Sequence, residues 1–294
     1  MAAVSAMALQ RVVVRMMYDP AFCKRVYANP ERALHDVPLT PQERQWLVTP
    51  KPSAYGADAY RSHRALTGLL EEFPVAGALA VRLPRGIQRL QQFFATRAFH
   101  QCVQARGSMA AAFGAYLGSE VFRSRNMPSE IAHMATVETA IAYVRRVSPT
   151  PLPPTESITT ETPFGLAPWV VLLTAHPAVS ARYHRLLASL QQHGGSLLEA
   201  ALDTPYRLPP GSAFRGKATT LILVSHIPDS DGPTLEGMTD DLGKLLTAAK
   251  TPMRLSDLSA LAEAMGCEPE EASDAVAELV DARILNPHPH PAVS

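Results

Sequence analysis

The sequence predicts an α+β protein, with an all-α N-terminal domain followed by a winged-helix-like C-terminal domain. Apolar residues recur at helical spacing through residues 1–147, and no convincing strand interrupts them. Residues 148–163 hold five prolines and many hydroxyl residues, which is typical of an extended linker. Beyond it, continuous apolar runs rich in β-branched residues alternate with short helices. We therefore expect domains at residues 1–147 and 164–294, joined by a linker at 148–163.

Composition and charge agree with two parts. The chain has 294 residues, of which 47% are hydrophobic, so it can bury a sizeable core. Residues 1–147 carry 18 Lys and Arg against 10 Asp and Glu, a net charge of +8. The remaining residues carry 9 against 17, a net charge of −8. This asymmetry favours an electrostatic contact between the parts or with a partner.

The cellular setting is predicted from three cysteines and the apolar runs. Cys23, Cys102 and Cys267 lie far apart, and an odd number without a CxxC pattern favours a reducing compartment. Arg11 and Arg15 interrupt the apolar N-terminus, so no signal peptide is expected. The longest apolar runs are too short to span a bilayer. We expect a cytoplasmic protein.

The first helices carry clear boundary signals. A helix should end near Tyr18, and a second should begin with Asp19 as its N-cap and with Phe22 and Val26 facing inward. The run TPQE at residues 40–43 predicts a capping box between Thr40 and Glu43. Further helices are expected over residues 58–73, closed by the following proline, and over 84–106, 108–122 and 129–147.

The C-terminal part begins with an expected buried strand over residues 169–174. A second strand is expected over 219–227, and a short third one near Thr234. Helices are expected over residues 183–190, 196–202, 240–249, 256–265 and 269–282, with Ser256 as an N-cap and Gly266 as a stop. Residues 284–285 could add a short strand.

The charge of the last helix separates two functions of such a module. Its carboxylates and the absence of Lys and Arg would repel DNA phosphates, which proteins contact through basic side chains. The sequence therefore favours peptide or protein binding over a winged-helix DNA-binding transcription regulator, which remains the alternative. The acidic residues of this helix are Glu270, Glu271, Asp274, Glu278 and Asp281.

No catalytic or metal-binding motif is present. His288 and His290 are two residues apart in the tail without a third ligand nearby, and His63, His133 and His226 stand alone, so no metal site is expected. Glu71 and Glu72 are neighbours on one expected helix and point about 100° apart, which favours a solvated pair over acid–base catalysis. An enzyme of unrecognised type in the helical half remains possible on sequence alone.

Basic residues are dense in the first half of the chain. Arg82, Arg85 and Arg89 fall at helical spacing, so they could line one helix face. A solvated face explains them most simply. The alternative is a dock for an acidic peptide or a partner subunit.

Two stretches carry a family resemblance. Residues 233–246 (PTLEGMTDDLGKLL), 255–262 (LSDLSALA) and 275–280 (AVAELV) resemble the peptide-recognition elements of ribosomally made peptide pathways, the fold of the pyrroloquinoline quinone chaperone family. Residues 11–20 (RVVVRMMYDP), 26–30 (VYANP) and 39–47 (LTPQERQWL) are similar to the partner subunits of multinuclear non-haem iron oxidative enzymes, which act in methanobactin and 3-thiaglutamate pathways.

This resemblance implies a non-catalytic subunit that binds a precursor peptide through its leader and presents it to an iron-dependent modifying enzyme in a heterodimer. The iron would belong to that enzyme, so no cofactor is expected in this chain, and neither nucleic acid nor membrane is an expected partner. Arg82, Arg85 and Arg89 would help to dock the enzyme. An extended peptide would add as a strand beside the last strand and the helix over 269–282. The implied peptide-binding residues are Leu221, Leu223, Ser225, Ile227, Thr234, Leu235, Ala272, Val276 and Leu279.

The sequence departs from that family in one respect. The usual recognition element has three strands before its helices, whereas here a helical insertion separates the first two strands. The resemblance therefore does not determine which strand edge binds the peptide.

Overall fold

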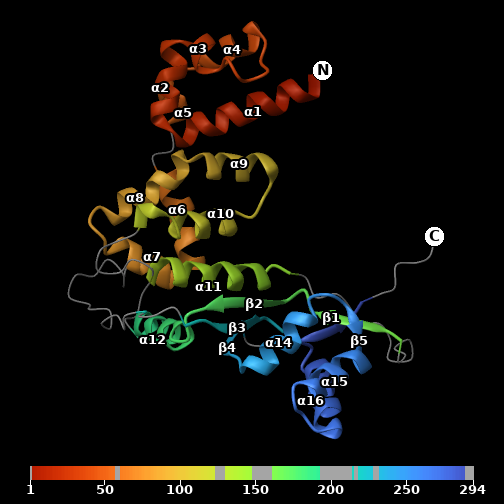
Figure 1. The fold of residues 1–294 in the computed structure, drawn as a ribbon. Coiled ribbons are helices and arrows are strands. Elements are labelled where there is room, and N and C mark those ends of the chain that lie inside the picture. Colours follow the sequence, from red (N-terminus) through yellow and green to blue (C-terminus); the bar gives the residue numbers. More distant parts are fainter. Residues whose placement is uncertain are drawn as a thin grey trace. The chain divides into compact units, whose positions relative to one another are not determined.

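The chain is an α+β protein with two small antiparallel three-stranded sheets (Figure 1). The computed structural model describes residues 2–56, 60–122, 130–147, 161–192, 214, 218–227 and 232–288. Contacts divide the chain into unit 1, residues 1–135 and 189–208, and unit 2, residues 136–188 and 209–294. The expected linker before residue 161 and the expected helix over 196–202 lie outside the described residues.

Helices make up every element of the described residues before position 148. Five of them begin at a proline, which is suited to the first turn because that turn leaves its N–H groups unpaired. The elements are α1 (Ala2–Tyr18), α2 (Pro20–Ala28), α3 (Pro30–Ala33), α4 (Pro41–Val48), α5 (Pro52–Tyr55), α6 (Arg61–Glu72), α7 (Pro74–Val81), α8 (Gly86–Gln92), η1 (Phe93–Ala95), α9 (Arg97–Ala105), α10 (Met109–Leu117), η2 (Glu120–Phe122) and α11 (Glu130–Val144).

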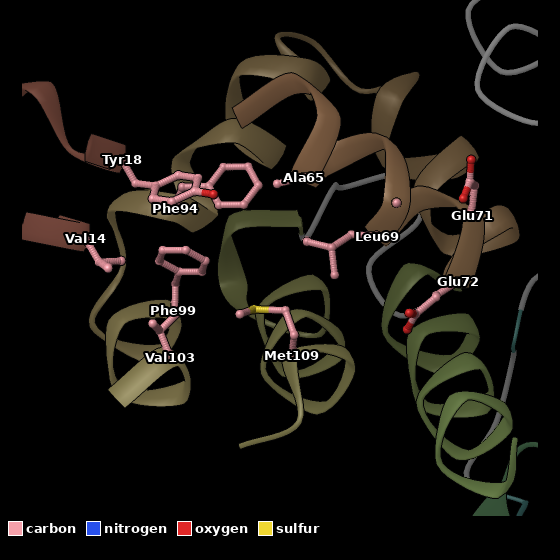
Figure 2. A pocket seen from close by; sticks show the side chains of 11 residues that line it. Val14, Tyr18, Ala65, Leu69, Glu71, Glu72, Phe94, Phe99, Val103 and Met109 are labelled. Atoms are coloured by element: carbon pink, nitrogen blue, oxygen red, sulfur yellow. The ribbon is translucent and has the colours of Figure 1, made fainter. Parts of the chain in front are cut away.

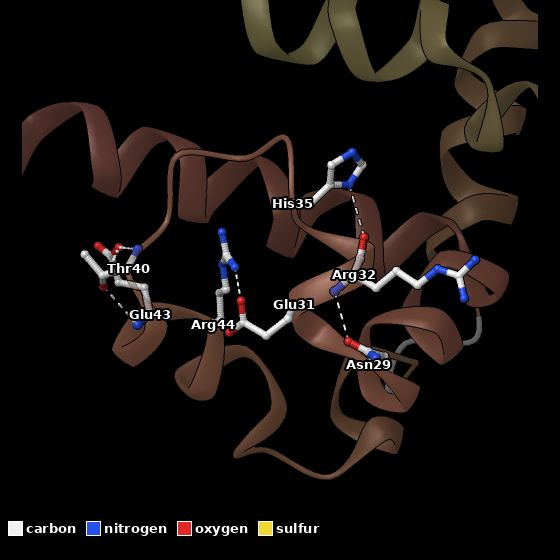
Figure 3. Close-up of polar contacts among 7 residues, drawn as sticks. All are labelled: Asn29, Glu31, Arg32, His35, Thr40, Glu43 and Arg44. Carbon is white, nitrogen blue, oxygen red and sulfur yellow. Dashed lines mark hydrogen bonds and ion pairs between the residues drawn. The ribbon is translucent and has the colours of Figure 1, made fainter.

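The predicted caps near the N-terminus are confirmed. The carboxylate of Asp19 accepts a hydrogen bond of 2.9 Å from the backbone N–H of Phe22, which fixes the start of α2. Thr40 and Glu43 form both halves of the capping box at α4, and Arg44 pairs with Glu31 across α3 and α4 (Figure 3). These contacts satisfy N–H groups that the first turn of a helix leaves without partners.

The expected long helix over residues 84–106 is wrong, since three separate elements occupy it. Arg85 adopts the left-handed conformation, with φ of 57°. The next residue, Gly86, packs closely against α7: a Cβ added to it would lie 2.2 Å from the carbonyl oxygen of Ala80. Thr96 then caps α9 by accepting from the N–H of Phe99. The expected stop before Pro74 is confirmed, because α6 ends at Glu72 and Pro74 opens the next helix, α7.

Aromatic rings form much of the core of unit 1. Phe93 is fully buried and contacts the rings of Phe94, Phe99 and Phe113 at centroid separations of 5.1–5.6 Å. Such edge-on contacts add to the free energy gained from burying apolar surface. Tyr60, just before α6, is by contrast 70% exposed.

Unit 2 holds both sheets. The first has the order β5-β1-β6, with β1 (Pro163–Leu166) between β5 (Met253–Arg254) and β6 (Leu285–Pro287). The second has the order β2-β3-β4, with β3 (Thr220–Ser225) between β2 (Val170–Ala175) and β4 (Thr234–Gly237). The predicted strands at 169–174, 219–227 and near Thr234 are therefore confirmed, whereas the sequence missed β1 at the end of the expected linker.

The helices of unit 2 alternate with these strands along the chain. They are α12 (Val179–Gln191), of which residues 179–188 belong to this unit, α14 (Asp240–Ala248), α15 (Leu255–Ala264) and α16 (Pro269–Asp281). The predicted stop at Gly266 is confirmed by its φ of 103°. The predicted N-cap at Ser256 is wrong, because α15 already begins at Leu255. The N-cap residue is Arg254, whose side chain makes no capping hydrogen bond.

Trp169 packs in a core that residues of both sheets and of the helices share. Trp169 is 2% exposed and lies in a core cluster with Phe164, Leu245 and Leu279. Its indole Nε1 donates a hydrogen bond of 3.0 Å to the carbonyl oxygen of Arg283 in the turn after α16. The residue that precedes β2 is thus held by both packing and a hydrogen bond.

Candidate functional site

The register of the second sheet shows which backbone groups are free. The N–H of His226 donates to the carbonyl of Trp169, and the N–H of Met238 donates to the carbonyl of Leu221. Hydrogen-bonded and non-hydrogen-bonded pairs alternate along antiparallel strands. The residues of β3 are therefore paired on both sides, and only β2 and β4 are edges.

The outer edge of β2 presents backbone groups that no described residue pairs. The same alternation turns the N–H and C=O groups of Leu172 and Thr174 away from β3. Neither residue has another hydrogen-bond partner among the described residues. Only the N–H of Val170, at the start of the strand, is satisfied locally, by the carbonyl of Ala167.

The outer edge of β4 is partly occupied. The carbonyl oxygen of Leu235 faces α12, where the hydroxyl of Ser180 donates to it at 3.3 Å and Nε2 of His184 lies 3.4 Å away. A strand added at β4 would have to displace these contacts. Among the described residues, nothing would have to be displaced at the outer edge of β2.

A pocket of about 640 Å³ lies against β3, the strand next to β2. Its lining residues include Leu221 of β3, Gly243 of α14, Leu261 of α15 and Met265, which follows α15. Leu221 is the cross-strand neighbour of Thr174, and an added Cβ on Gly243 would lie 2.7 Å from Cδ1 of Leu221. Glycine thus lets α14 approach the sheet closely while the pocket stays largely apolar.

The predicted peptide-binding residues do not form one exposed surface. Leu223 on β3 and three residues of α16 are core residues, so their side chains are unavailable to a ligand in this structure; on α16 these are Ala272, Val276 and Leu279. Leu221 lines the pocket, and Ile227 packs partly buried against the core. The sequence pattern identified the inner side of the helix, and this side packs against the sheets rather than facing solvent.

Two further predicted residues lie on β4. Thr234 is exposed, and its hydroxyl is 2.8 Å from that of Ser225, which is buried on β3. Leu235 is buried. The structure therefore brings Ser225, Thr234 and Leu235 together, on the side of the sheet away from the free edge.

The carboxylates of α16 face solvent, as a solvated helix surface would. All five acidic residues noted in the sequence are exposed. Apolar residues of the opposite side pack into the core of unit 2.

A second pocket, in unit 1, has a volume of about 680 Å³ (Figure 2). Its walls are largely apolar, and Tyr18 stacks with Phe94 at a centroid separation of 5.5 Å. Glu71 and Glu72 line the side away from Tyr18 and point in different directions. This arrangement does not direct two carboxylates at one substrate atom.

The three arginines of the expected docking face do not share one helix. Arg82 is the exposed residue after α7, and Arg85 is the left-handed residue before α8. Arg89 lies within α8 and donates to the carbonyl of Val121 at 3.2 Å. Sequence spacing grouped them because it assumed one continuous helix through residues 84–106.

The described residues offer no activated nucleophile among the cysteines and no metal cluster. Cys23, Cys102 and Cys267 are free thiols, and burial raises the pKa of the first two, which disfavours their thiolates. No group of three or more His, Cys, Asp or Glu side chains that could hold a metal ion occurs within the described ranges. Nor does any helix there have the length and apolar character of a membrane span.

The single histidines are dispersed. His63 lies on α6 and His133 on α11, whereas His226 directly follows β3 and His288 follows β6. His290 lies outside the described residues. Comparison of the sequence with protein-family models and with curated proteins finds no match to either.

Proposed function

We propose that this chain is a peptide-binding accessory subunit that takes up an extended precursor peptide at the edge of β2 and presents it to an iron-dependent modifying enzyme. In this proposal the winged-helix-like C-terminal domain binds the leader, and the all-helical N-terminal domain docks the enzyme. The iron is held by the partner, and this chain contributes no catalytic residue. The enzyme partner is inferred from the family resemblance of the N-terminal segments.

The observation that carries the peptide-binding proposal is the free edge of β2. Natural sheet edges are protected by charged residues, prolines, bulges or covering segments, because unpaired strands recruit other strands. The strand has the sequence VVLLTA, with neither a charge nor a proline. An extended peptide would satisfy the groups of Leu172 and Thr174, as in other strand-addition complexes.

The nearby pocket supplies a place for a side chain. Alternate residues of an added strand point to the same face of the sheet as Leu172 and Thr174. That face carries Leu221, which is the cross-strand neighbour of Thr174 and lines the pocket. Backbone pairing would give affinity, and an apolar peptide side chain near the pocket would give specificity.

The alternative, a DNA-binding regulator, is disfavoured by the exposed carboxylates of α16. A recognition helix without Lys or Arg lacks the phosphate contacts that supply most of the affinity for duplex DNA. Tight duplex binding that weakens steeply with salt would support the regulator against the present proposal.

The proposal is tested by co-purifying the tagged full-length chain with the products of its neighbouring genes. Recovery of an iron-containing subunit in a near 1:1 complex, together with a bound precursor peptide, is the expected result. A chain that emerges alone and does not bind such peptides would contradict it.

A matched pair of variants then locates the peptide. Thr174→Pro removes an N–H that faces the edge, while the bonds of β2 to β3 come from other residues. We expect it to weaken peptide binding at least about tenfold, the loss expected for a hydrogen bond together with a steric block. Thr174→Val keeps the N–H and the β-branch, so it should bind normally. Equal binding by both variants would exclude the β2 edge.

A further inference from the structure

Three arginines of unit 1 line one pocket around a buried aromatic ring. Arg15 comes from α1, Arg25 from α2 and Arg32 from α3, and the pocket has a volume of about 510 Å³. Phe22 forms part of its wall and is 4% exposed. Three basic residues from three helices therefore line one pocket, together with the carboxylate of Asp36.

Two of the guanidinium groups lie near the same ring. The guanidinium carbon of Arg15 is 3.9 Å from the ring centroid of Phe22, and that of Arg25 is 5.7 Å away. A ring face attracts a cation, so Phe22 helps to hold both guanidinium groups. Burial lowers the pKa of Arg15; the carboxylate of Asp19 opposes this, and the charge of Arg25 lowers the pKa further.

The described part of the chain neutralises these charges only in part. Nε of Arg15 is buried without a hydrogen-bond partner, and the nearest oxygen of Asp19 is 3.9 Å away. The other oxygen of Asp19 is used to cap α2. An unpaired buried donor is costly, so a hydrogen-bond acceptor supplied from outside would be stabilising.

The carboxylate that lines the pocket, that of Asp36, has a neighbouring partner of its own. Asp36 lies 2.8 Å from Nε2 of His35, whose Nδ1 is 3.1 Å from the carbonyl of Arg32. The side chains of Arg25 and Arg32 make no hydrogen bond or ion pair within the described residues. In Figure 3 the side chain of Arg32 extends away from α3, and only its backbone takes part in the drawn contacts.

We propose that this pocket binds the oxyanion group, phosphate or carboxylate, of a small organic ligand. Planar guanidinium groups match both kinds of oxyanion, with two parallel N–H donors each. A neighbouring pocket of about 430 Å³ shares Arg15 and Phe22 and is also lined by Met7, Val12 and Pro38. These three side chains provide an apolar surface for the body of the ligand, beside the polar Arg11 and Gln104. This inference is independent of the peptide-binding proposal, which concerns unit 2.

Isothermal titration of the full-length chain with two aromatic probes tests the site. Phenyl phosphate and phenylacetate carry the two oxyanions on a similar apolar body, and inorganic phosphate reports on the oxyanion alone. At about 0.15 M salt, where long-range attraction is largely screened, we expect at least one aromatic probe to bind with Kd below about 1 mM. Binding of only one aromatic probe would show whether the natural ligand is a phosphate or a carboxylate.

Three charge-neutralising variants give the contrast. Arg25→Gln and Arg32→Gln should each raise Kd about tenfold, as loss of a charge-assisted hydrogen bond does. Lys24→Gln removes the same charge from an exposed neighbour on α2 that does not line the pocket, so its Kd should be unchanged. Arg25 and Arg32 are exposed, so the variants should fold, and a thermal unfolding curve checks this.

Failure of both aromatic probes to bind would overturn the proposal. A loss in Lys24→Gln equal to that in Arg32→Gln would also overturn it, because a general attraction to positive charge would then explain the binding.

Discussion

The two proposed sites would recognise their ligands through different parts of the chain. At the edge of β2 in unit 2, the groups offered are backbone N–H and C=O groups of Leu172 and Thr174. In the pocket of unit 1, the groups offered are the side chains of Arg15, Arg25 and Arg32. The edge is almost uncharged, whereas the pocket is defined by charge.

This difference decides which changes each site tolerates. A backbone site should survive most side-chain substitutions and fail when an N–H is removed or the strand is displaced. A side-chain site should respond to each charge separately and to the salt concentration. The four predictions below test this contrast, beginning with the largest expected effect.

Trp169→Ala should damage unit 2 and leave the pocket of unit 1 intact. Truncation of a buried tryptophan costs about 3–5 kcal/mol, and this one also loses its hydrogen bond to Arg283. Amide exchange in β2 and β3 should accelerate, and peptide binding should be lost. Retained oxyanion binding, measured on the same protein, would show that the sites are separable; its loss would contradict the contrast.

Salt should separate the two kinds of binding. Raising the ionic strength from about 0.05 M to about 0.5 M shortens the screening length from roughly 14 Å to about 4 Å. We expect the Kd of the oxyanion probe to rise about fivefold or more, and that of the peptide to change less than about twofold. Similar salt dependence at both sites would mean that the edge, too, binds through charge.

Thr40→Ala should lower the stability of unit 1 without changing the charge of the pocket. Loss of the cap on α4 costs about 1 kcal/mol of unfolding free energy. Urea unfolding measures this cost, and Thr40→Ser serves as the control that keeps the hydroxyl. The Kd of the oxyanion probe should stay unchanged in both variants; a change would show that helix stability, not charge, governs binding.

The pKa of His100 depends on the charge of Arg15. Its contribution to the pH dependence of stability should be the smallest of the four effects. Burial lowers the pKa of His100, and the positive charge of Arg15 lowers it further. A folded-state pKa below the unfolded value means that the unfolded chain binds more protons at low pH, so stability falls as pH drops below about 6.5. His100→Gln should lessen this loss in urea unfolding at pH 7.5 and 5.5.

An NMR titration of the ring gives the matching observation. Arg15→Gln should move the pKa of His100 upward, towards its ordinary value, because a neighbouring positive charge is removed. An unmoved pKa would mean that Arg15 does not act on His100.

Local signals in the sequence predicted much of the fold. Asp19 and Thr40 were identified because caps and prolines act within one turn of a helix. The strands of the second sheet were identified because β-branched apolar runs suit buried strands. The break near Arg85 was missed, since it depends on the close approach of Gly86 to α7, which no local pattern reveals.

The sites were harder to predict for the same reason. Apolar spacing correctly identified Ala272 and Val276 as one side of α16, but it cannot tell a core surface from a binding surface. The order of strands, which makes β2 an edge and β3 the centre, is set by tertiary pairing. Arg15, Arg25 and Arg32 come together only because α1, α2 and α3 fold against one another.

The central claim, that β2 is a free edge which accepts a peptide strand, can be tested most directly by residue-resolved amide hydrogen exchange. Without a peptide, the amides of Leu172 and Thr174 should exchange quickly. The amide of Leu173 should be protected, because its N–H points to β3 and is hydrogen-bonded there. Addition of the precursor peptide should protect Leu172 and Thr174. Protection of both amides before the peptide is added, or protection that appears instead at Leu235 on β4, would contradict the account.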